Sequence, residues 1–523
     1  MKMFTKNKLK SDLKNSGLKA GAIVMVHSSL SSLGWVQGGA ETVIEALLEV
    51  IGEDGTLLMP ALTAGSKQVP FEGKQTPSYL GKITEAFRTW PGVKRSFHPT
   101  HSVLALGKAA DFLLAYHIDA KSACGPGTPY YRLAEIGGYV LLLGVDLDRC
   151  TILHTAEDLA DCPFLKERIF YYRNQEGVIC EKVLQKFPGP HRDFIGLDQR
   201  FRRSGIIKLG LVGDAVTRLI EAKALLSDAT KLLRENPAAI LCNNPSCQDC
   251  LQQKGRIRAS TLLKERFSLA AIIPDFPPHS DATFDILSHY GVDTIELSDY
   301  LTTKILINGD LYLEGLSKKI EEKKLEVSGI GIATDLKSLV DKKLTPQAER
   351  LRDIANNLRA KFLRLRIRQS WLSENDEILE AIRTLARELE KVGVRLLIAN
   401  DPQGPFAEPE EVRALFLQLK AEKSENISFA FDPVGFVEAG KSPFRNTFNK
   451  VSKVIRNLYL TDSRFKDGTL TPLRKGNGEI KELVSALRCR SYSGYSTVGS
   501  LTDYDPFSLE ERLQDFWDMF SSL

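Results

Sequence analysis

Two short segments of the chain carry histidines beside small polar and acidic residues. The first is 95–102, which contains His98 and His101, and the second is 150–158, which contains His154. Histidine is the natural base for deprotonating an amine near neutral pH, and a second group must orient its imidazole. Small polar residues nearby can contact an acyl donor. These residue types and their spacing indicate an enzyme that acylates amines.

His154 is the candidate base. If residues 154–158 open a helix, Glu157 at i+3 and Asp158 at i+4 share its face, so either carboxylate can hold the imidazole in one tautomer. A histidine that binds a carboxylate only for stability is the structural alternative. A His-x-x-Glu pair can also be half of a carboxylate-bridged metal site, but the chain has no Glu-x-x-His partner for it.

Alternating strands and helices must position these segments. The pattern predicts buried strands over 19–27, 55–60 and 138–144, and a helix over 41–51. A polar, glycine-rich loop over 28–39 joins the first strand to that helix. A loop in this position offers backbone N–H groups to a phosphate or an oxyanion.

The pattern of apolar segments changes in the second half of the chain, after the cysteine-rich and basic stretch at 242–266. Eight strand candidates follow, and nearly all precede a helical stretch: 269–273, 293–297, 326–333, 362–367, 394–398, 427–431, 455–460 and 492–498. This number and the length of about 255 residues fit a (β/α)8 TIM barrel. The fold class is therefore α/β, with domains over 1–260 and 266–523.

Composition agrees with a two-domain globular protein. The chain has 523 residues, 43% of them hydrophobic and 26% charged. A net charge of +4 is small for this length and does not indicate nucleic-acid binding. The basic N-terminus lacks the apolar stretch of a signal peptide, and no apolar run reaches the length of a membrane span. We expect a cytoplasmic protein without membrane contact, and a homo-oligomer is compatible with the sequence.

Three cysteines, Cys242, Cys247 and Cys250, have C-x4-C-x2-C spacing. In a reducing compartment such a group favours a structural zinc site over disulfides, and zinc needs a fourth ligand. Three reduced thiols that close the domain are the main alternative, and an iron–sulfur cluster is a more distant one. The remaining cysteines are expected to be buried apolar residues: Cys124, Cys150, Cys162, Cys180 and Cys489.

Residues 5 to about 255 resemble the aminoglycoside 3-N-acetyltransferase family. The resemblance rests on several motifs in the same order: 26–34 with 38–42, 95–99, 125–129, and 142–145 leading to 151–157. It implies transfer of an acetyl group from acetyl-CoA to the amine of an amino sugar. The acceptor is then an aminoglycoside, with a role in antibiotic resistance, or a nucleotide-linked amino sugar.

The resemblance also implies roles for individual residues. It favours Glu157 as the group that orients His154, and it gives His98 a supporting or acceptor-facing role. His191 corresponds to a place where relatives carry His or Cys, which makes it the expected fourth zinc ligand. Asp158 lies in the acidic stretch expected near the acceptor. The positions similar to coenzyme contacts are His27, Ser28, Ser29, Leu30 and Ser102.

Residues 267 to 523 resemble the xylose-isomerase-like barrels on four motifs: 291–297, 348–352, 430–433 and 458–462. In that family acids and histidines hold a divalent metal. Here Ala399, Tyr459 and Gly499 replace expected ligands, Asp432 is left largely alone, and no histidine follows His289. The barrel is predicted to be a binding or scaffolding module or an enzyme with altered chemistry. A bifunctional protein with an active epimerase or isomerase barrel is the alternative.

Arg364, Arg366 and Arg368 alternate along one barrel strand and so point to the same face. Arginines cannot be buried against helices without partners, which favours the barrel interior, toward Glu296, Asp335 or Asp432. An internal ion network is one interpretation. The other makes Arg368 a contact for an anionic sugar or a nucleotide-sugar phosphate at the mouth of the barrel.

Overall fold

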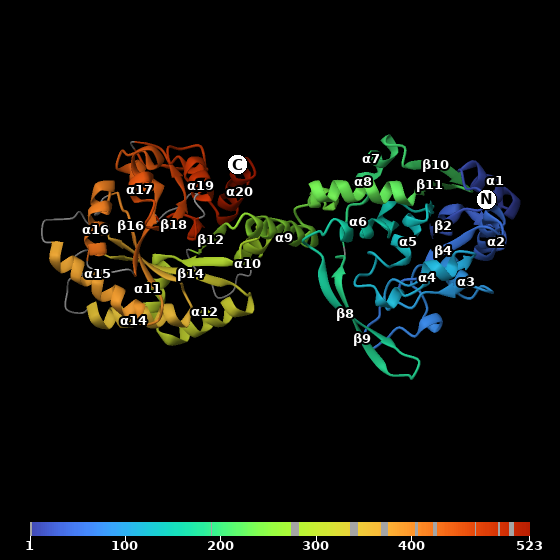
Figure 1. Cartoon of the computed structure of the whole chain (residues 1–523), viewed down its shortest axis with the longest axis horizontal. Coiled ribbons are helices and arrows are strands. Elements are labelled where there is room, and N and C mark those ends of the chain that lie inside the picture. The colour runs from blue at the N-terminus through green and yellow to red at the C-terminus, as the bar shows by residue number, and fades with distance from the viewer. Residues whose placement is uncertain are drawn as a thin grey trace. The chain divides into compact units, whose positions relative to one another are not determined.

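The computed structural model describes residues 3–189, 191–273, 282–334, 344–367, 375–402, 406–421, 426–465, 467–489, 492–501 and 507–523. The chain divides into two compact units, Met1–Ile257 and Arg258–Leu523. Figure 1 shows the mixed sheet of the first unit and the barrel of the second. Each unit has its own hydrophobic core. None of the helices in the described residues has the length and apolar character needed to cross a membrane.

A seven-stranded mixed sheet forms the centre of the first unit, in the order β10-β11-β7-β2-β4-β6-β5. Its strands are β2 Ile23–Ser28, β4 Thr56–Pro60, β5 Lys94–Arg95, β6 Val103–Gly107, β7 Tyr139–Leu143, β10 Ile207–Val212 and β11 Ala215–Glu221. The three central strands β7, β2 and β4 run parallel, and the flanking strands are antiparallel. Central strands are buried on both faces, which explains their continuous apolar runs.

Helices cover both faces of this sheet. Alternate residues of β2 serve the two sides, since Val24 and Val26 belong to one core and Met25 to the other. The first core includes α1 Lys6–Asn15, α2 Gly39–Ile51 and α3 Lys82–Arg88. The second includes α4 Ala110–Leu114, α5 Pro129–Glu135, α6 Leu153–Leu159, α7 Asp198–Arg203, α8 Ala222–Glu235 and the start of α9 Gln248–Lys264.

Two small sheets complete the first unit. Strand β1 Met3–Phe4 pairs with β3 Trp35–Val36 and so connects the N-terminal segment to the loop after β2. Strands β8 Lys166–Arg173 and β9 Ile179–Phe187 form an antiparallel hairpin. Several apolar residues of this hairpin are exposed, including Ile169 and Val183, which pair across the two strands.

Eight parallel strands close into a barrel in the second unit. They are β12 Ser268–Ile273, β13 Thr294–Leu297, β14 Glu326–Thr334, β15 Phe362–Ile367, β16 Arg395–Ala399, β17 Ile427–Phe431, β18 Ile455–Leu460 and β21 Tyr495–Val498. These segments are the ones that the apolar runs predict, with shifted ends at several strands. The largest shift is at the last strand, which begins at Tyr495 and not at Tyr492.

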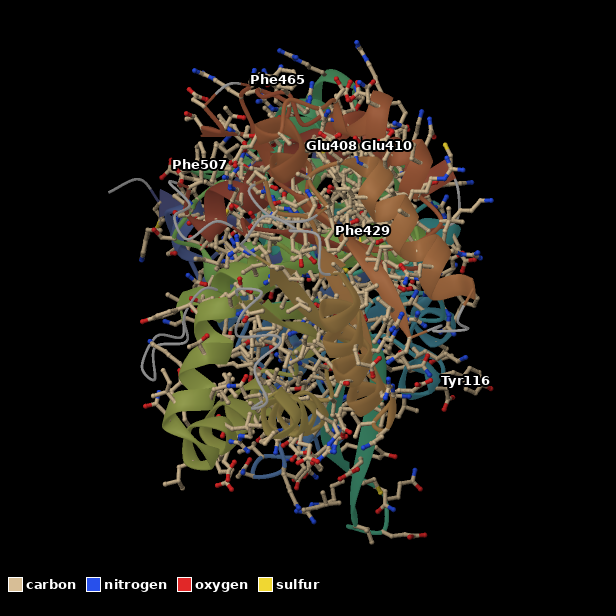
Figure 2. All side chains as sticks on the ribbon, turned by 90° about the vertical axis from the view of Figure 1, so that its left-hand side faces the viewer. Tyr116, Glu408, Glu410, Phe429, Phe465 and Phe507 are labelled. Carbon is tan, nitrogen blue, oxygen red and sulfur yellow. The ribbon has the colours of Figure 1, made fainter. Side chains whose placement is uncertain are left out.

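Side chains of the barrel strands separate into an inner and an outer layer. Leu363 and Leu365 of β15 join the large outer core, whereas Phe362 belongs to a small inner cluster with Tyr459. Phe429 of β17 packs edge-on against Phe416 in that outer core, and Figure 2 shows Phe429 inside the second unit. The helices of this unit are α10 Ala282–His289, α11 Asp299–Asn308, α12 Asp310–Glu322, α14 Leu344–Asn357, α15 Asn375–Glu390, α16 Pro409–Ala421, α17 Pro433–Glu438, α18 Asn449–Val451, α19 Ile480–Cys489 and α20 Leu509–Phe520.

The expectation that five cysteines are buried holds for three of them. Cys124, Cys150 and Cys162 are buried, but Cys180 is half-buried and Cys489 is exposed. Cys180 lies in the hairpin strand β9, whose side chains are largely accessible, and Cys489 is the last residue of α19. Neither position faces a closed core, so the apolar character of the thiol does not determine its burial.

Candidate functional site

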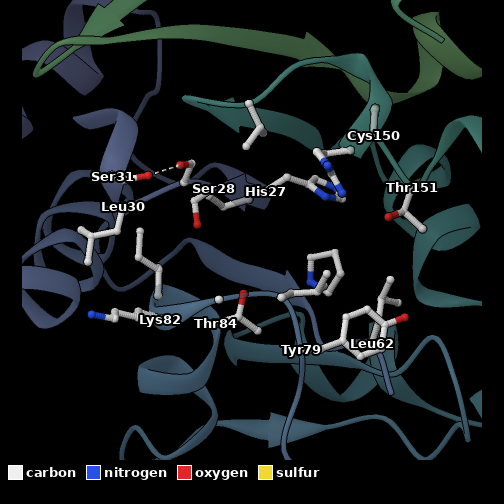
Figure 3. Close-up of a pocket in the computed structure, with 18 of the residues that line it drawn as sticks. His27, Ser28, Leu30, Ser31, Leu62, Tyr79, Lys82, Thr84, Cys150 and Thr151 are labelled. Atoms are coloured by element: carbon white, nitrogen blue, oxygen red, sulfur yellow. Dashed lines mark hydrogen bonds between the residues drawn. The ribbon is translucent and has the colours of Figure 1, made fainter. Parts of the chain in front are cut away.

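A cavity of about 990 Å³ lies at the carboxyl ends of the central strands of the first unit. Because β2, β4 and β7 run parallel, the segments that follow them meet at one edge of the sheet. In Figure 3, His27 and Ser28 lie across the cavity from Tyr79 and Lys82. The lining residues are Val26–Ser31, Gly34–Val36, Gly39, Pro60, Leu62, Tyr79–Thr84, His101, Val145, Asp148–Thr151 and His154.

His154 and Glu157 form a hydrogen-bonded pair on α6. His154 Nδ1 lies 2.9 Å from Glu157 Oε2. The side chain of His154 is 21% exposed and lines the cavity, whereas Glu157 is fully buried. An ionised carboxylate can only accept a hydrogen bond, so Nδ1 carries the proton and Nε2 is left as the basic nitrogen. The i+3 spacing thus brings together the two residues that the sequence singles out.

Electrostatics keep Glu157 ionised. Its burial raises its pKa, but His154 and Arg192 together outweigh burial and hold the pKa of Glu157 below its usual value. Arg192 Nε donates to Glu157 Oε1, the oxygen that His154 does not use. Sequence reasoning did not identify Arg192, because 35 residues separate it from Glu157 and no local spacing relates them.

His98 lies outside the cavity lining and is fully buried. Its Nδ1 accepts hydrogen bonds from the backbone N–H of Thr100, at 3.3 Å, and of His101, at 2.9 Å. Its ring stacks on that of His117, with 4.4 Å between the centroids. Burial and the neighbouring histidines hold the pKa of His98 well below its usual value. His98 is thus a neutral residue whose hydrogen bonds fix the loop that bears His101. Of its two expected roles, the one that faces the acceptor does not fit this buried position.

Four of the residues expected to contact the coenzyme line the cavity: His27, Ser28, Ser29 and Leu30. Burial lowers the pKa of His27 to about 4, so its ring is neutral near pH 7. One expectation for this loop needs correction. The backbone N–H of Ser29 donates to the carbonyl of Leu143 at 3.0 Å and is therefore not free for an oxyanion.

Ser102, also expected at the coenzyme, does not line the cavity. It is fully buried, and its hydroxyl donates to the carbonyl of Ala61 at 2.7 Å and accepts from Arg95 Nε at 2.9 Å. Both contacts fix the segment between β5 and β6. The serine is therefore committed to local structure, which corrects the expected coenzyme contact.

The two residues expected to bind the acceptor have different outcomes. Asp158 lies on α6 outside the cavity lining, and its Oδ1 is 3.8 Å from Lys186 Nζ. Its contact with the hairpin strand β9 turns it away from the role predicted from local acidity. Arg368 lies outside the described residues.

Sequence reasoning also missed residues on the far wall of the cavity. Tyr79 and Lys82 come from the irregular region between β4 and β5, where no periodicity marks a site. His101 belongs to the first histidine segment, but its position there does not by itself predict a role at the site. Burial, with a smaller effect of His154, lowers the pKa of His101 to about 3, so His101 stays neutral.

A second group of side chains fits a metal ion. His191, Cys242, Cys247 and Cys250 place their ligand atoms within 4.8 Å of one another. His191 Nδ1 lies 3.2 Å from the sulfur of Cys250 and 3.5 Å from that of Cys247. Three thiols and one imidazole are a donor set that suits tetrahedral zinc. The structure thus brings together the four residues that the sequence and the family resemblance predict.

The barrel interior of the second unit holds an ion network. Arg364 Nε donates to Glu296 Oε1 at 2.8 Å, and Arg364 Nη2 lies 2.8 Å from Asp299 Oδ1. Arg366 Nη2 donates to Asp299 at 3.0 Å, and Tyr459 Oη donates to Glu296 at 2.7 Å. The two arginines thus share one face, as their alternation predicts, and their acidic partners lie in the barrel interior.

Asp432, the acid that the predicted resemblance of the barrel leaves as a metal ligand, is engaged locally. Its Oδ1 accepts from the backbone N–H of Val434 at 3.1 Å and from Thr461 Oγ1 at 3.2 Å. Burial raises the pKa of Asp432 to about 6. Its neighbours in the described residues include no histidine, which agrees with the absence of histidine after His289 in the sequence.

Comparison with known proteins places the first unit in context. A family model described as aminoglycoside 3-N-acetyltransferase matches residues 25–234. An aminoglycoside N(3')-acetyltransferase-like protein, YokD, of Bacillus subtilis is 35% identical over 263 residues, which cover 44% of this chain and 93% of that protein. Aminoglycoside N(3)-acetyltransferase VII of Streptomyces paromomycinus is 35% identical over 270 residues, 44% of this chain and 92% of that protein.

Among solved structures, AAC-IIIb in a binary complex with CoASH matches with a TM-score of 0.42 and 30% identity. The match covers 45% of this chain and 97% of AAC-IIIb. All these full-length matches account for less than half of the present chain.

Proposed function

The chain belongs to the aminoglycoside 3-N-acetyltransferase family, and from this membership we propose that His154 is the general base of the reaction. The enzyme transfers an acetyl group from acetyl-CoA to the amine of an amino sugar. The observation that carries the assignment of His154 is its 2.9 Å hydrogen bond to buried Glu157 at the wall of the 990 Å³ cavity.

Both ring nitrogens of His154 have a role in the proposed reaction. The amine nitrogen attacks the thioester carbonyl carbon while Nε2 of His154 takes a proton from that nitrogen. The tetrahedral oxyanion then collapses, the C–S bond breaks, and the proton on the imidazolium passes to the departing CoA sulfur. Glu157 holds the Nδ1 proton and stabilises the positive charge on His154 between these steps.

The coenzyme is assigned to the side of the cavity formed by the loop after β2. Ser28, Ser29 and Leu30 line this wall. The cavity lining also includes the cations Lys82, on the opposite wall, and Arg149, which pairs with Asp148, and we assign these two to the phosphates of acetyl-CoA. Since Ser29 N–H is already bonded, we assign the oxyanion contact to the hydroxyl of Ser28. His27 contributes a neutral, buried ring behind this loop.

We assign an aminoglycoside as the acceptor, with a consequent role in antibiotic resistance. The names of relatives such as the Streptomyces paromomycinus enzyme support this substrate class. One observation favours the alternative, a nucleotide-linked amino sugar: the cavity lining has two cationic side chains, Lys82 and Arg149, and one acidic side chain, Asp148. Before the coenzyme phosphates engage these two cations, an anionic nucleotide suits that balance better than a polycation does.

A test of both assignments is CoA release from acetyl-CoA with aminoglycosides and nucleotide-linked amino sugars in parallel, on wild type, His154→Ala and His289→Ala. His289 lies on α10 of the barrel unit, so its replacement is the matched histidine control. We expect His154→Ala to lower kcat by about 10²-fold or more and His289→Ala to leave it unchanged. Full activity of His154→Ala would refute the base assignment. The substrate class is identified by which of the two groups of acceptors the wild-type enzyme acetylates faster.

The His191–cysteine cluster is proposed to bind structural zinc, as its donor set and spacing support. When bound, zinc would cross-link the segment after β9 to the start of α9. Elemental measurement on purified protein should find about one zinc per chain. We expect Cys247→Ser to lose the metal and Cys489→Ser, at an exposed cysteine of the barrel unit, to keep it. Less than half an equivalent in wild type contradicts the assignment.

The barrel is proposed to be a xylose-isomerase-like (β/α)8 domain over 266–523 that binds or scaffolds without metal catalysis, and the acetyltransferase domain is assigned to 1–260. The ion network among Arg364, Glu296 and Asp299 supports this interpretation, since it fills the interior with partnered charges. Use of acetyl-CoA supports a cytoplasmic location. Epimerase or isomerase turnover that depends on added divalent metal would contradict the barrel assignment.

A further inference from the structure

One short segment of the first unit contacts three different parts of the site. It runs over 191–194, between β9 and the turn at Ile195–Leu197. His191 contacts the cysteines of the proposed zinc site, with its Nδ1 3.2 Å from the sulfur of Cys250. Phe194 packs edge-on against the ring of His154, with centroids 5.1 Å apart. Between these two, Arg192 reaches Glu157.

Arg192 is held on several sides. It is buried, with 9% of the residue exposed, and its Nε donates to Glu157 Oε1. Its Nη1 donates to the carbonyl of His191 at 2.7 Å. The guanidinium lies over the ring of Phe164, 4.6 Å from the centroid. A planar guanidinium fixed by two hydrogen bonds and a ring has one orientation, and that orientation points a cation at Glu157.

The two oxygens of Glu157 have separate partners. Oε2 faces His154 and Oε1 faces Arg192, so rotation of the carboxylate would break both contacts together. A carboxylate in a fully buried position is costly without a cation close by. Arg192 therefore supplies what His154 alone cannot, a permanent charge that does not leave when the imidazole is neutral.

We infer that Arg192 is a positioning residue for acetyl transfer, which acts through Glu157 on the orientation of His154. The inference rests on the proposed function, in which His154 is the base. Arg192 does not line the cavity, so its effect passes through the carboxylate and not through contact with acetyl-CoA or the amine. Its loss should consequently lower kcat and leave both KM values unchanged.

The test compares Arg192→Met, Arg192→Lys, Glu157→Gln and the double variant Glu157→Gln/Arg192→Met by steady-state kinetics with acetyl-CoA. We expect Arg192→Met to lower kcat by about 10- to 100-fold, the range typical for residues that orient a reactive group. Arg192→Lys should recover part of this loss, because lysine restores the charge but not the planar fork. In the Glu157→Gln background, Arg192→Met should change kcat by less than about twofold.

The matched control is Arg200→Met, which removes another arginine–carboxylate pair of this unit, the one with Asp228, away from the cavity. It should leave kcat unchanged. If Arg192→Met does not fold, as judged by circular dichroism, Arg192→Lys decides the matter by a reduced kcat at unchanged KM.

A folded Arg192→Met with normal kcat, or a loss that is equally large in the Glu157→Gln background, would overturn the inference. The kcat of His154→Ala, measured in the same experiment, distinguishes a failure of the base assignment from a failure of the role of Arg192. If His154→Ala is active, the proposed base is wrong. If His154→Ala is inactive while both Arg192 variants behave as wild type, only the role of Arg192 is wrong.

Discussion

Glu157 accepts one hydrogen bond from the imidazole of His154 and one from the guanidinium of Arg192. His154 is partly exposed and lines the cavity, and Arg192 is buried on the other side of the carboxylate. The carboxylate is the link between a residue that must exchange a proton and one that never does. Glu157 therefore determines which ring nitrogen of His154 carries the proton and stabilises the imidazolium form of His154.

Replacing Glu157 by glutamine should lower kcat by about 10²-fold, since the amide cannot stabilise the imidazolium that forms during the reaction. The same change leaves the Arg192 cation buried without its anion, so the free energy of unfolding should fall by about 3 kcal/mol. Enzyme kinetics and thermal unfolding of the variant measure the two effects.

Asp158→Asn is the matched control for this change. Asp158 faces Lys186 and does not line the cavity, so its amide should keep kcat within about twofold of wild type. A larger loss for Asp158→Asn than for Glu157→Gln would mean that the neighbouring acid, and not Glu157, orients His154.

At the scale of elements, the ends of the parallel strands form the cavity, and their geometry limits which residues fit there. Gly144 follows β7 with a φ of 72°, a conformation that residues with a side chain rarely adopt. A Cβ at this position would lie 2.7 Å from Cβ of Ser32, in the loop that carries Ser28 to Leu30. The close approach of these two connections thus depends on the missing side chain.

Gly144→Ala should therefore displace the loop after β2 and raise the KM for acetyl-CoA, by about fivefold or more, in addition to lowering thermal stability. Gly137→Ala is the control, because Gly137 has a similar φ of 71° but nothing within 4 Å of a Cβ. It should lower stability alone. Equal KM values in the two variants would disprove the role of Gly144 in shaping the loop.

Much of the framework follows from sequence patterns. Buried parallel strands are apolar throughout, so runs such as Phe362–Ile367 are recognised within a few residues. The hairpin β8–β9 was not predicted, because its exposed strands mix polar and apolar residues without a clear period. Local spacing likewise predicts the His154–Glu157 pair, whereas the far wall around Tyr79 depends on the path of an irregular segment.

At the scale of the whole molecule, burial lowers the pKa of several histidines in the first unit and raises the pKa of two carboxyls in the barrel unit. The first unit buries His27, His98, His101 and His117, and burial lowers the pKa of each. The barrel unit buries Glu296 and Asp432, and burial raises the pKa of both. Histidines with a lowered pKa and carboxyls with a raised pKa change stability in opposite directions as acid is added.

Calorimetry between pH 7 and pH 5 should therefore show opposite shifts in the two units. The histidines bind protons in the unfolded chain below about pH 6.5 but not in the folded one, so the first unit loses stability as the pH falls. Asp432, with a folded pKa of about 6, binds its proton in the folded state first, so the barrel gains stability over the same range. We expect each transition to move by at least about 3 °C.

Leu363→Ala identifies which transition is which. Leu363 is fully buried in the outer core of the barrel, and its truncation should destabilise that unit by about 3 kcal/mol. The other transition and the rate of acetyl transfer should not change. If the midpoint temperatures of both transitions shift in the same direction with pH, the predicted opposite effects of the buried histidines and of Asp432 are wrong.

Closure of the barrel has a consequence for assembly. Strand β12 pairs with both β13 and β21, so this sheet has no edge with free N–H and C=O groups. The open sheet of the first unit instead ends at β10 and at the two-residue strand β5. A second chain that adds a strand to one of these two main sheets can do so only on the first unit, where β10 is the longer of the two terminal strands.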